Sequence, residues 1–171
     1  MRVLDWLTVF AVVVCLLISA FFSASETALA ASSRAAMLRL EKQGKREAGI
    51  VNRLMATRER LLGAILFANN FTNIAASTLA TGLLLAYFGE AGVIYATFAM
   101  TLVIFVLAEV LPKTAAFNAP DRMALAVASP VERTVRLFSP LLRVVEWLVR
   151  WIITSETVSS RKSSKPPIMS R

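Results

Sequence analysis

Residues 105–113 read Phe-Val-Leu-Ala-Glu-Val-Leu-Pro-Lys and place Glu109 inside an apolar segment that extends from about residue 93 to residue 117. A carboxylate at bilayer depth costs roughly 2.5–3.5 kcal/mol on insertion scales, so it normally marks an ion or proton site. Pro112 has no N–H, which predicts a helix break and leaves the carbonyl of Ala108 without its helical partner. The stretch therefore predicts hard oxygen ligands for a cation inside a membrane helix.

Two further apolar segments, 3–31 and 61–88, are each long enough to span the ~30 Å of hydrocarbon in a bilayer. The chain has 171 residues, of which 57% are hydrophobic and 18% are charged. This composition predicts an all-α membrane protein with three transmembrane helices, at 3–31, 61–88 and 93–117, in one domain that covers residues 1–153. A cleavable signal peptide is the alternative for 3–31, but its apolar region would be only about 7–15 residues long.

Residues 33–60 separate the first two spans and are polar, dense in Lys and Arg, and helical in pattern. Ser33 is a suitable N-cap, and Gly44 divides the stretch into a pair of short helices. The positive charge predicts that this pair is cytoplasmic, whereas the turn at 89–92 lacks basic residues and is predicted to lie outside. Three crossings then place the N-terminus outside and the C-terminus in the cytoplasm.

The segment after the third span is hydrophobic enough to be considered as a fourth span, but its charges favour an interfacial helix. In a helix over residues 131–153, five charged side chains fall on one narrow stripe: Glu132, Arg136, Arg143, Glu146 and Arg150. That amphipathic pattern predicts a juxtamembrane helix lying in the membrane interface. Residues 154–171 are rich in Ser, Lys and Pro and are predicted to form a disordered tail.

The net charge of +8 comes from 19 Lys and Arg against 11 Asp and Glu. The basic residues flank apolar spans and form no recognition motif, so membrane lipids rather than nucleic acid are the predicted partners. The chain contains no histidine, which excludes Ser-His catalysis and His-ligated zinc, and Cys15 has no second cysteine for a disulfide. We therefore expect that the domain is not an enzyme.

Polar residues of all three spans are expected at a similar depth. At ~1.5 Å per residue from the charged residues at the inner surface, Ser25, Asn70 and Glu109 lie about 13–18 Å deep. The candidate metal ligands are Ser23, Ser25, Asn69, Asn70, Asn73 and Glu109. Such oxygens suit Mg²⁺, Ca²⁺ or Na⁺ and disfavour zinc, copper and iron. The structural alternatives are amide bonds between helices, hydroxyls that bond their own helix, and a protonated buried acid.

A stripe of small residues, each four positions from the next, also runs along the second span. Its members are Ala64, Ala68, Thr72, Ala76 and Ala80. Such a stripe lets another helix approach closely, from the same chain or from a second copy.

Three motifs resemble the transmembrane (DUF21) domain of the CNNM/CorC family, and the likeness covers about residues 1–150. They are Phe-Phe-Ser-Ala-Ser-Glu-Thr-Ala-Leu at 21–29, Asn69-Asn70 with Asn73, and Ala-Glu-Val-Leu-Pro-Lys at 108–113. The resemblance implies a homodimeric magnesium transporter of the bacterial inner membrane, generally regarded as an exporter that exchanges Mg²⁺ for Na⁺. It implies that the ion is held by Ser23, Ser25, Asn69, Asn70, Asn73 and Glu109, with Pro112 as the helix break.

Members of this family usually continue into a cytosolic pair of CBS domains that binds ATP, and we expect such a module in the full-length protein. The main alternative to transport is a non-transporting dimeric membrane anchor for that module, held together through the small-residue stripe. A transporter for another cation, such as Na⁺ or Co²⁺, is the second alternative. An intramembrane enzyme with a Ser-Lys pair that uses Lys113 is the third.

Overall fold

The computed structural model describes residues 3–163, with side chains except at position 142 and from 145 onward. Its elements are α1 (Val3–Ala31), α2 (Arg34–Lys42), α3 (Arg46–Ala56), α4 (Arg58–Phe88), α5 (Ala91–Val103), η1 (Ile104–Val110), α6 (Leu111–Asn118) and α7 (Pro120–Ser163). Three helical stretches are long and apolar enough to cross a membrane: Val3–Ala31, Arg58–Phe88 and Ala91–Asn118. The last consists of α5, η1 and α6 in succession. The all-α class and the three predicted spans are confirmed.

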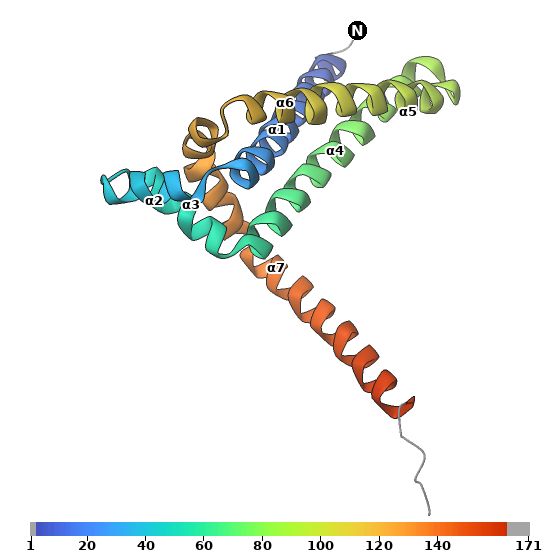
Figure 1. The fold of residues 1–171 in the computed structure, drawn as a ribbon. Coiled ribbons are helices and arrows are strands. Elements are labelled where there is room, and N and C mark those ends of the chain that lie inside the picture. Colours follow the sequence, from blue (N-terminus) through green and yellow to red (C-terminus); the bar gives the residue numbers. More distant parts are fainter. Residues whose placement is uncertain (1–2, 164–171) are drawn as a thin grey trace, which may run out of the picture.

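The helices α4 and α5 form an antiparallel hairpin, and α1 packs against α4 and against η1, the continuation of α5 (Figure 1). The hairpin turns at Gly89, whose φ of +60° is readily adopted only by glycine. Gly92 starts the return helix very close to α4, because a Cβ built on it would lie 2.3 Å from the carbonyl oxygen of Leu84. One glycine thus permits the turn, and the other permits the close approach of the two helices.

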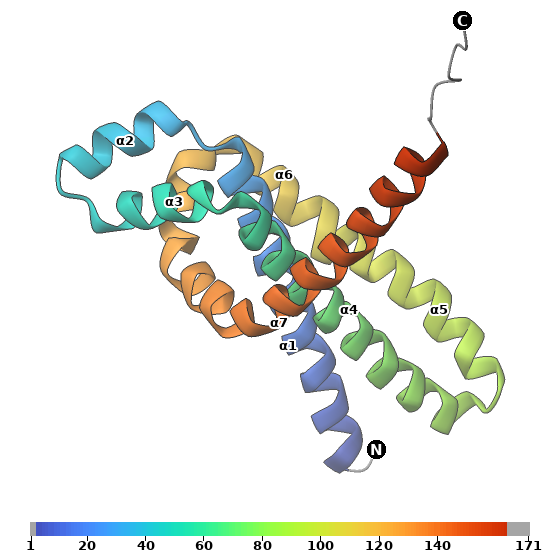
Figure 2. The same cartoon turned by 90° about the horizontal axis from the view of Figure 1, so that it is seen from below.

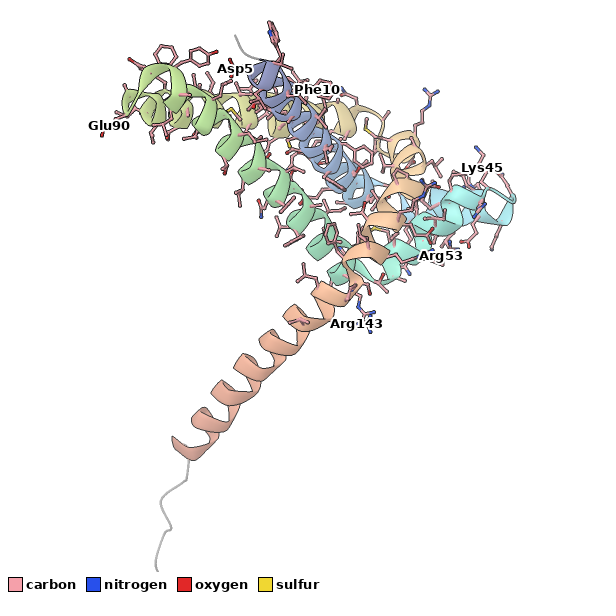
Figure 3. The ribbon with its side chains drawn as sticks, turned by 180° about the vertical axis from the view of Figure 1, so that it is seen from behind. Asp5, Phe10, Lys45, Arg53, Glu90 and Arg143 are labelled. Carbon is pink, nitrogen blue, oxygen red and sulfur yellow. The ribbon has the colours of Figure 1, made fainter. Side chains whose placement is uncertain are left out.

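The helices α2 and α3 form a second hairpin at the opposite end of the molecule, as the positions of Lys45 and Glu90 show in Figure 3. The Ser33 hydroxyl caps α2 by accepting a 3.4 Å hydrogen bond from the backbone N–H of Ala36. Gly44, with a φ of +86°, lies in the turn between the two helices. The Asn52 amide of α3 donates to the Glu41 carboxylate of α2. The predicted helical pair, its N-cap and its division at Gly44 are confirmed.

The last helix, α7, is longer than predicted. Only Ala119 separates it from α6, and α7 starts at Pro120 because the first position of a helix needs no N–H donor. It continues to Ser163, beyond both ends of the predicted 131–153 helix and into the stretch predicted to be disordered. Adding a residue to an existing helix costs little free energy. A prediction from the composition of residues 154–171 alone does not take this into account. Residues 164–171 lie outside the described part of the chain.

The first part of α7 packs on the body of the molecule, and the rest projects away from it (Figures 1 and 2). Between these parts the helix changes direction, and Pro130 and Pro140 inside it each remove a backbone hydrogen-bond donor. Two polar contacts attach the near part to the body. The Ser33 N–H donates to the Asp121 carboxylate at 2.7 Å, and Arg53 of α3 pairs with Glu132 at 3.3 Å. Glu132 is thus one member of the predicted charged stripe with a partner in the body.

The small-residue stripe of α4 is buried inside the chain. Its four alanines, Ala64, Ala68, Ala76 and Ala80, are at most 9% exposed. Ala68 belongs to the larger apolar cluster, which α1, α2, α3, α4, α6 and α7 build together. Further along α4, Ala76 and Ala80 pack with Met100 of α5 and with the first half of α1. The stripe was predicted to let a helix approach closely, either from the same chain or from a second copy. In this structure the approaching helices belong to the same chain.

Large apolar side chains cover much of the outer surface of the three candidate spans. Trp6 and Phe10 of α1 and Phe98 of α5 are each more than 60% exposed, and Glu90 marks the same end of the molecule (Figure 3). Exposed apolar area on this scale is unusual for a water-soluble monomer and is typical of a surface in contact with lipid. The second hairpin is rich in basic residues, so this basic surface lies at the end of the molecule opposite the exposed aromatic side chains.

Replacing Gly92 by Ala should lower the free energy of unfolding by roughly 1–3 kcal/mol, because the new Cβ would overlap the backbone of Leu84. Gly82→Ala is the matched control, since nothing lies within 4 Å of a Cβ at that position. Thermal unfolding of both variants in detergent checks the prediction. Equal stability of the two variants would contradict the close approach described here.

Candidate functional site

The best-defined polar contact between the spans is centred on Ser19 of α1. Its hydroxyl oxygen lies 2.6 Å from the amide oxygen of Asn69 and 2.6 Å from that of Asn73, both on α4. Ser19 is fully buried and Asn69 is 8% exposed. Three oxygens from two apolar helices therefore meet within hydrogen-bond distance.

These three oxygens cannot all be satisfied by the hydroxyl alone. A serine hydroxyl carries one hydrogen, so it can donate to only one of the two amide oxygens. Either the other amide turns its NH₂ group toward Ser19, or a positive charge lies among the three oxygens. The cluster can therefore be completed either by an amide NH₂ group or by a cation.

The third span reaches the same region through a change in helical hydrogen bonding. Residues Ile104–Val110 form a π-helix, in which the N–H of Leu111 bonds to the carbonyl of Val106, five residues back. The Ser23 hydroxyl of α1 donates to the backbone carbonyl of Glu109 at 3.3 Å. Ser23 is fully buried and lies one turn after Ser19, so the contacts of α1 with α4 and with η1 are adjacent.

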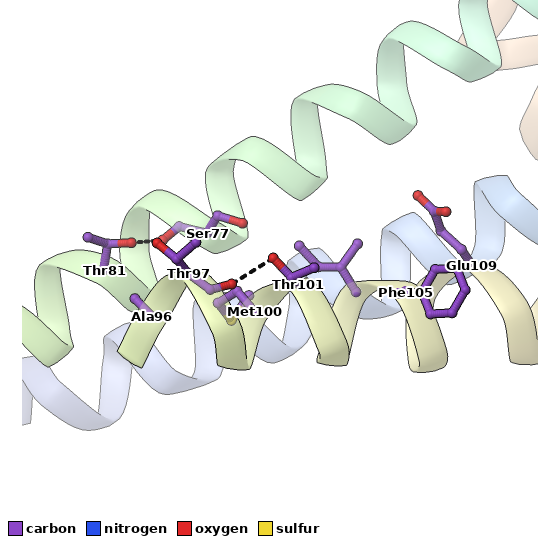
Figure 4. A pocket seen from close by; sticks show the side chains of 9 residues that line it. Ser77, Thr81, Ala96, Thr97, Met100, Thr101, Phe105 and Glu109 are labelled. Carbon is purple, nitrogen blue, oxygen red and sulfur yellow. Dashed lines mark hydrogen bonds between the residues drawn. The ribbon is translucent and has the colours of Figure 1, made fainter. Parts of the chain in front are cut away.

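The Glu109 side chain points into a cavity between α4 and the helix formed by α5 and η1 (Figure 4). The cavity has a volume of about 440 Å³, and Glu109 is its one acidic lining residue. Its polar lining is otherwise made of hydroxyls, from Ser77, Thr81, Thr97 and Thr101. Thr81 and Thr101 donate their hydrogens to carbonyls of their own helices, so their oxygen lone pairs are left for another partner.

Polar residues recur at every fourth position on α1 and α4, which brings them onto one face of each helix. On α1 the positions are Ser19, Ser23 and Thr27, and on α4 they are Asn69, Asn73, Ser77 and Thr81. On α5 and η1 the polar residues that line the cavity are Thr97, Thr101 and Glu109, with the apolar Phe105 between the last two. Ser19, Ser77, Thr81, Thr97 and Thr101 were not among the predicted site residues. The four-residue spacing was the signal that could have found them.

The structure does not bring all the predicted ligands together. Ser23, Asn69, Asn73 and the Glu109 backbone take part in the contacts between spans. Ser25, although buried, donates to the carbonyl of Phe21 in its own helix, which was its structural alternative. Asn70 is exposed on the outer face of α4.

The region around Pro112 also differs from the prediction. The helix does not end there, since α6 begins at Leu111 with Pro112 in its first turn and the π-helical segment precedes it. The carbonyl that a neighbouring span uses is that of Glu109 and not that of Ala108. A π-helical segment accommodates an irregularity in the hydrogen-bond ladder without ending the helix. Sequence patterns do not distinguish such a segment from a helix break.

An ion pair lies one turn beyond this region, toward the ends of α1 and α6. Lys113 contacts the Glu26 carboxylate at 3.5 Å, and both side chains are about 40% exposed. The pair joins α1 to α6 and neutralises Glu26, the one acid of the motif at residues 21–29. Lys113 therefore has an acidic partner, which gives no support to its use in a Ser-Lys pair.

The donor set is dominated by uncharged oxygens. Within the described residues there is no group of three or more His, Cys, Asp or Glu side chains that could hold a metal ion. The set consists of hydroxyl, amide and carbonyl oxygens between the spans, together with the Glu109 carboxylate in the neighbouring cavity. Hard cations that accept neutral oxygen ligands fit such a set, whereas zinc and copper sites normally need thiolate or imidazole.

Ser19→Ala should lower the free energy of unfolding by about 1 kcal/mol, because it leaves Asn69 and Asn73 without their partner between the helices. Ser25→Ala is the matched control, since that hydroxyl bonds only its own helix. Thermal unfolding of the purified variants compares them. The contact with Ser19 would be energetically unimportant if the two variants unfolded at the same temperature.

Comparison with known proteins identifies relatives of the chain. The family model described as the cyclin M transmembrane N-terminal domain, CNNM, matches residues 10–169. The UPF0053 inner membrane protein YfjD of Escherichia coli (strain K12) is 37% identical over 136 residues. A UPF0053 protein of Haemophilus influenzae is 34% identical over 137 residues, and a chloroplastic DUF21 domain-containing protein of Arabidopsis thaliana is 35% identical over 136 residues.

Each of these alignments covers 80% of this chain but only 32%, 32% and 21% of the respective relatives. The chain therefore spans a third or less of the length of the relatives it matches. The family model covers nearly the whole of it, including all three apolar helices. The protein is thus a membrane protein that belongs to the CNNM family, defined by the cyclin M transmembrane N-terminal domain.

Proposed function

We propose that this domain transports Mg²⁺ across the membrane through a site between α1, α4 and η1. The observation that carries the proposal is the meeting of oxygens from three apolar helices, at Ser19, Ser23, Asn69, Asn73 and Glu109. Membership of the CNNM family supports the same cargo. Polar groups at this depth are costly, so their concentration in one place favours a function in ion passage.

The ligand types suit Mg²⁺ as a transported ion. Mg²⁺ prefers six oxygen ligands and gives up its water reluctantly, so a site that binds it needs several oxygens and a negative charge. Glu109 supplies the charge, while the hydroxyl, amide and carbonyl oxygens can replace part of the hydration shell. A single carboxylate keeps the binding weak enough for release, which a transporter requires.

The hydroxyl-lined cavity is the proposed route between this site and the side of the α4–α5 turn. It extends from Glu109 along Thr101 and Thr97 on one wall and along Ser77 and Thr81 on the other (Figure 4). These hydroxyls offer lone pairs to a passing cation without binding it strongly. The cavity connects to the ligand cluster through α4, because Ser77 lies one turn after Asn73.

The π-helical segment is the proposed moving part. A π-turn carries one extra residue compared with an α-turn, and such segments occur often at functional sites. Conversion of η1 to α-helical hydrogen bonding would rotate Glu109 relative to α1 and would break its carbonyl contact with Ser23. The carboxylate could then face either side of the site in turn.

Export, with Na⁺ as the coupling ion, is the direction that the CNNM/CorC resemblance implies. The same resemblance supports a homodimer in the bacterial inner membrane with the N-terminus outside, together with a cytosolic CBS-type partner module. The Escherichia coli relative carries the description of an inner membrane protein, which agrees with this location. The non-transporting anchor is less favoured, since its dimer contact relied on alanines that are buried within the chain.

Glu109→Gln should weaken Mg²⁺ binding at least about tenfold, because it removes the one carboxylate while keeping the shape of the side chain. Calorimetry of the purified 171-residue domain measures this, and added Na⁺ should weaken wild-type binding if the two ions exchange. Asn70→Ala is the control on the neighbouring span, and it should bind Mg²⁺ as wild type does because Asn70 is exposed.

Equal binding by wild type and Glu109→Gln would overturn the proposed site. If Asn70→Ala lost binding to the same extent, Asn70 would be a ligand, as predicted from the sequence, and the site would not be limited to the residues that the structure brings together.

The proposed orientation predicts the accessibility of the two hairpin turns. In a Cys15→Ser background, a thiol introduced by Glu90→Cys should react with a membrane-impermeant maleimide in intact cells. A thiol introduced by Lys45→Cys should react only after the cells are opened. The reverse pattern would invert the orientation of the domain.

A further inference from the structure

A second cavity lies away from the oxygen cluster, at the corner where α1 ends and α4 begins. Its volume is about 320 Å³. Its polar lining comes from Ser32, Arg34, Asn52 and Arg58, and its apolar lining from Met37, Val51 and Met55. Met37 and Val51 are each 1% exposed, so the apolar part of the cavity is built into the core of the α2–α3 hairpin.

Two arginines line this cavity from two different helices. Arg34 is the first residue of α2, and Arg58 is the first residue of α4. Both are exposed, and neither is paired with a carboxylate within the described residues. Arg53, by contrast, is paired with Glu132. The cavity therefore brings together two positive charges that have no carboxylate partner among the side chains that the structure describes.

Two acidic residues near the cavity have other partners. Glu41 accepts from Asn52, and Asp121 accepts from the backbone N–H of Ser33. Glu59 follows Arg58 in the first turn of α4 and is exposed. The two arginines and the N-terminal turns of two helices favour an anion in the cavity, whereas the Ser32 hydroxyl already donates to the carbonyl of Leu29.

The position of the cavity indicates which anion it meets. The candidate membrane spans end at Ala31 and begin at Arg58, immediately beside the cavity. A bilayer surface presents phosphodiester groups at that level, with glycerol and acyl carbons directly below them. We propose that this cavity binds the phosphate of an anionic phospholipid, with Arg34 and Arg58 as the phosphate ligands and the methionines beside the glycerol carbons.

This arrangement differs from general attraction of a basic surface to an acidic membrane. Arginine presents a planar fork of donors that matches two phosphate oxygens at once. Arginines elsewhere on the same hairpin, such as Arg39 and Arg46, are exposed but do not line the cavity. A free phosphate would use the same two guanidinium groups but would leave the apolar lining without a partner.

The test measures binding of dioctanoyl phosphatidylglycerol to the full 171-residue chain in a neutral detergent, by calorimetry or native mass spectrometry. The Arg34→Gln/Arg58→Gln variant should lose affinity about tenfold or more, because each arginine contributes charged hydrogen bonds. The Arg39→Gln/Arg46→Gln variant, which removes the same net charge, should keep wild-type affinity. Dioctanoyl phosphatidylcholine should bind more weakly than phosphatidylglycerol to wild type.

Equal losses in the two double variants would overturn the proposal, because they would indicate attraction by surface charge alone. Absence of binding to wild type would overturn it as well. Inorganic phosphate that competes fully with the lipid at similar concentration would overturn the lipid assignment in favour of a soluble anion. Circular dichroism checks that the variants are folded. If a double variant does not fold, the single variants Arg34→Gln and Arg58→Gln replace it, and each should bind the lipid more weakly than wild type.

Discussion

The contact of Ser19 with Asn69 and Asn73 joins α1 to α4 within apolar helices, where a polar group is stabilised by a partner inside the protein. This requirement explains why the polar residues of the three spans occupy one face of each helix. It also explains why small alanines flank them, since the helices must be close for a serine hydroxyl to reach an amide. Buried alanines on α4 and the contact at Ser19 are thus two aspects of the same packing arrangement.

Much of the fold could be predicted from the sequence, because length and hydropathy decide which segments can cross a membrane. The spans near residues 3–31 and 61–88 and the divided hairpin at Gly44 follow from apolar runs, charge and one glycine. The extent of α7 did not follow. Its prolines and its Ser- and Lys-rich end suggested interruption, but Pro120 starts a helix well and Pro130 and Pro140 bend it without ending it.

The site was predictable in part. Glu109, Asn69 and Asn73 are unusual residues in apolar segments, so they attract attention individually. Ser19 does not, because a lone serine in a membrane helix normally bonds its own backbone, as Ser25 does here. Whether a serine faces a neighbouring helix depends on the rotation of the two helices, which the three-dimensional packing decides. The π-helical segment before Pro112 could not be predicted either, because it differs from an α-helix only in which carbonyl each N–H bonds.

The single residue between α6 and α7 gives the domain a mechanical property. Ala119 is too short a connection to absorb displacement, and Asp121 is attached to the corner between α1 and α2 through Ser33. The helix that carries Glu109 is therefore joined almost rigidly to the long arm formed by the distal part of α7 (Figure 1). A small rotation at this joint would sweep the far end of the arm through a larger arc. The arm would thus act as a lever, because a rearrangement around the half-buried Glu109 would be enlarged at the far end of α7.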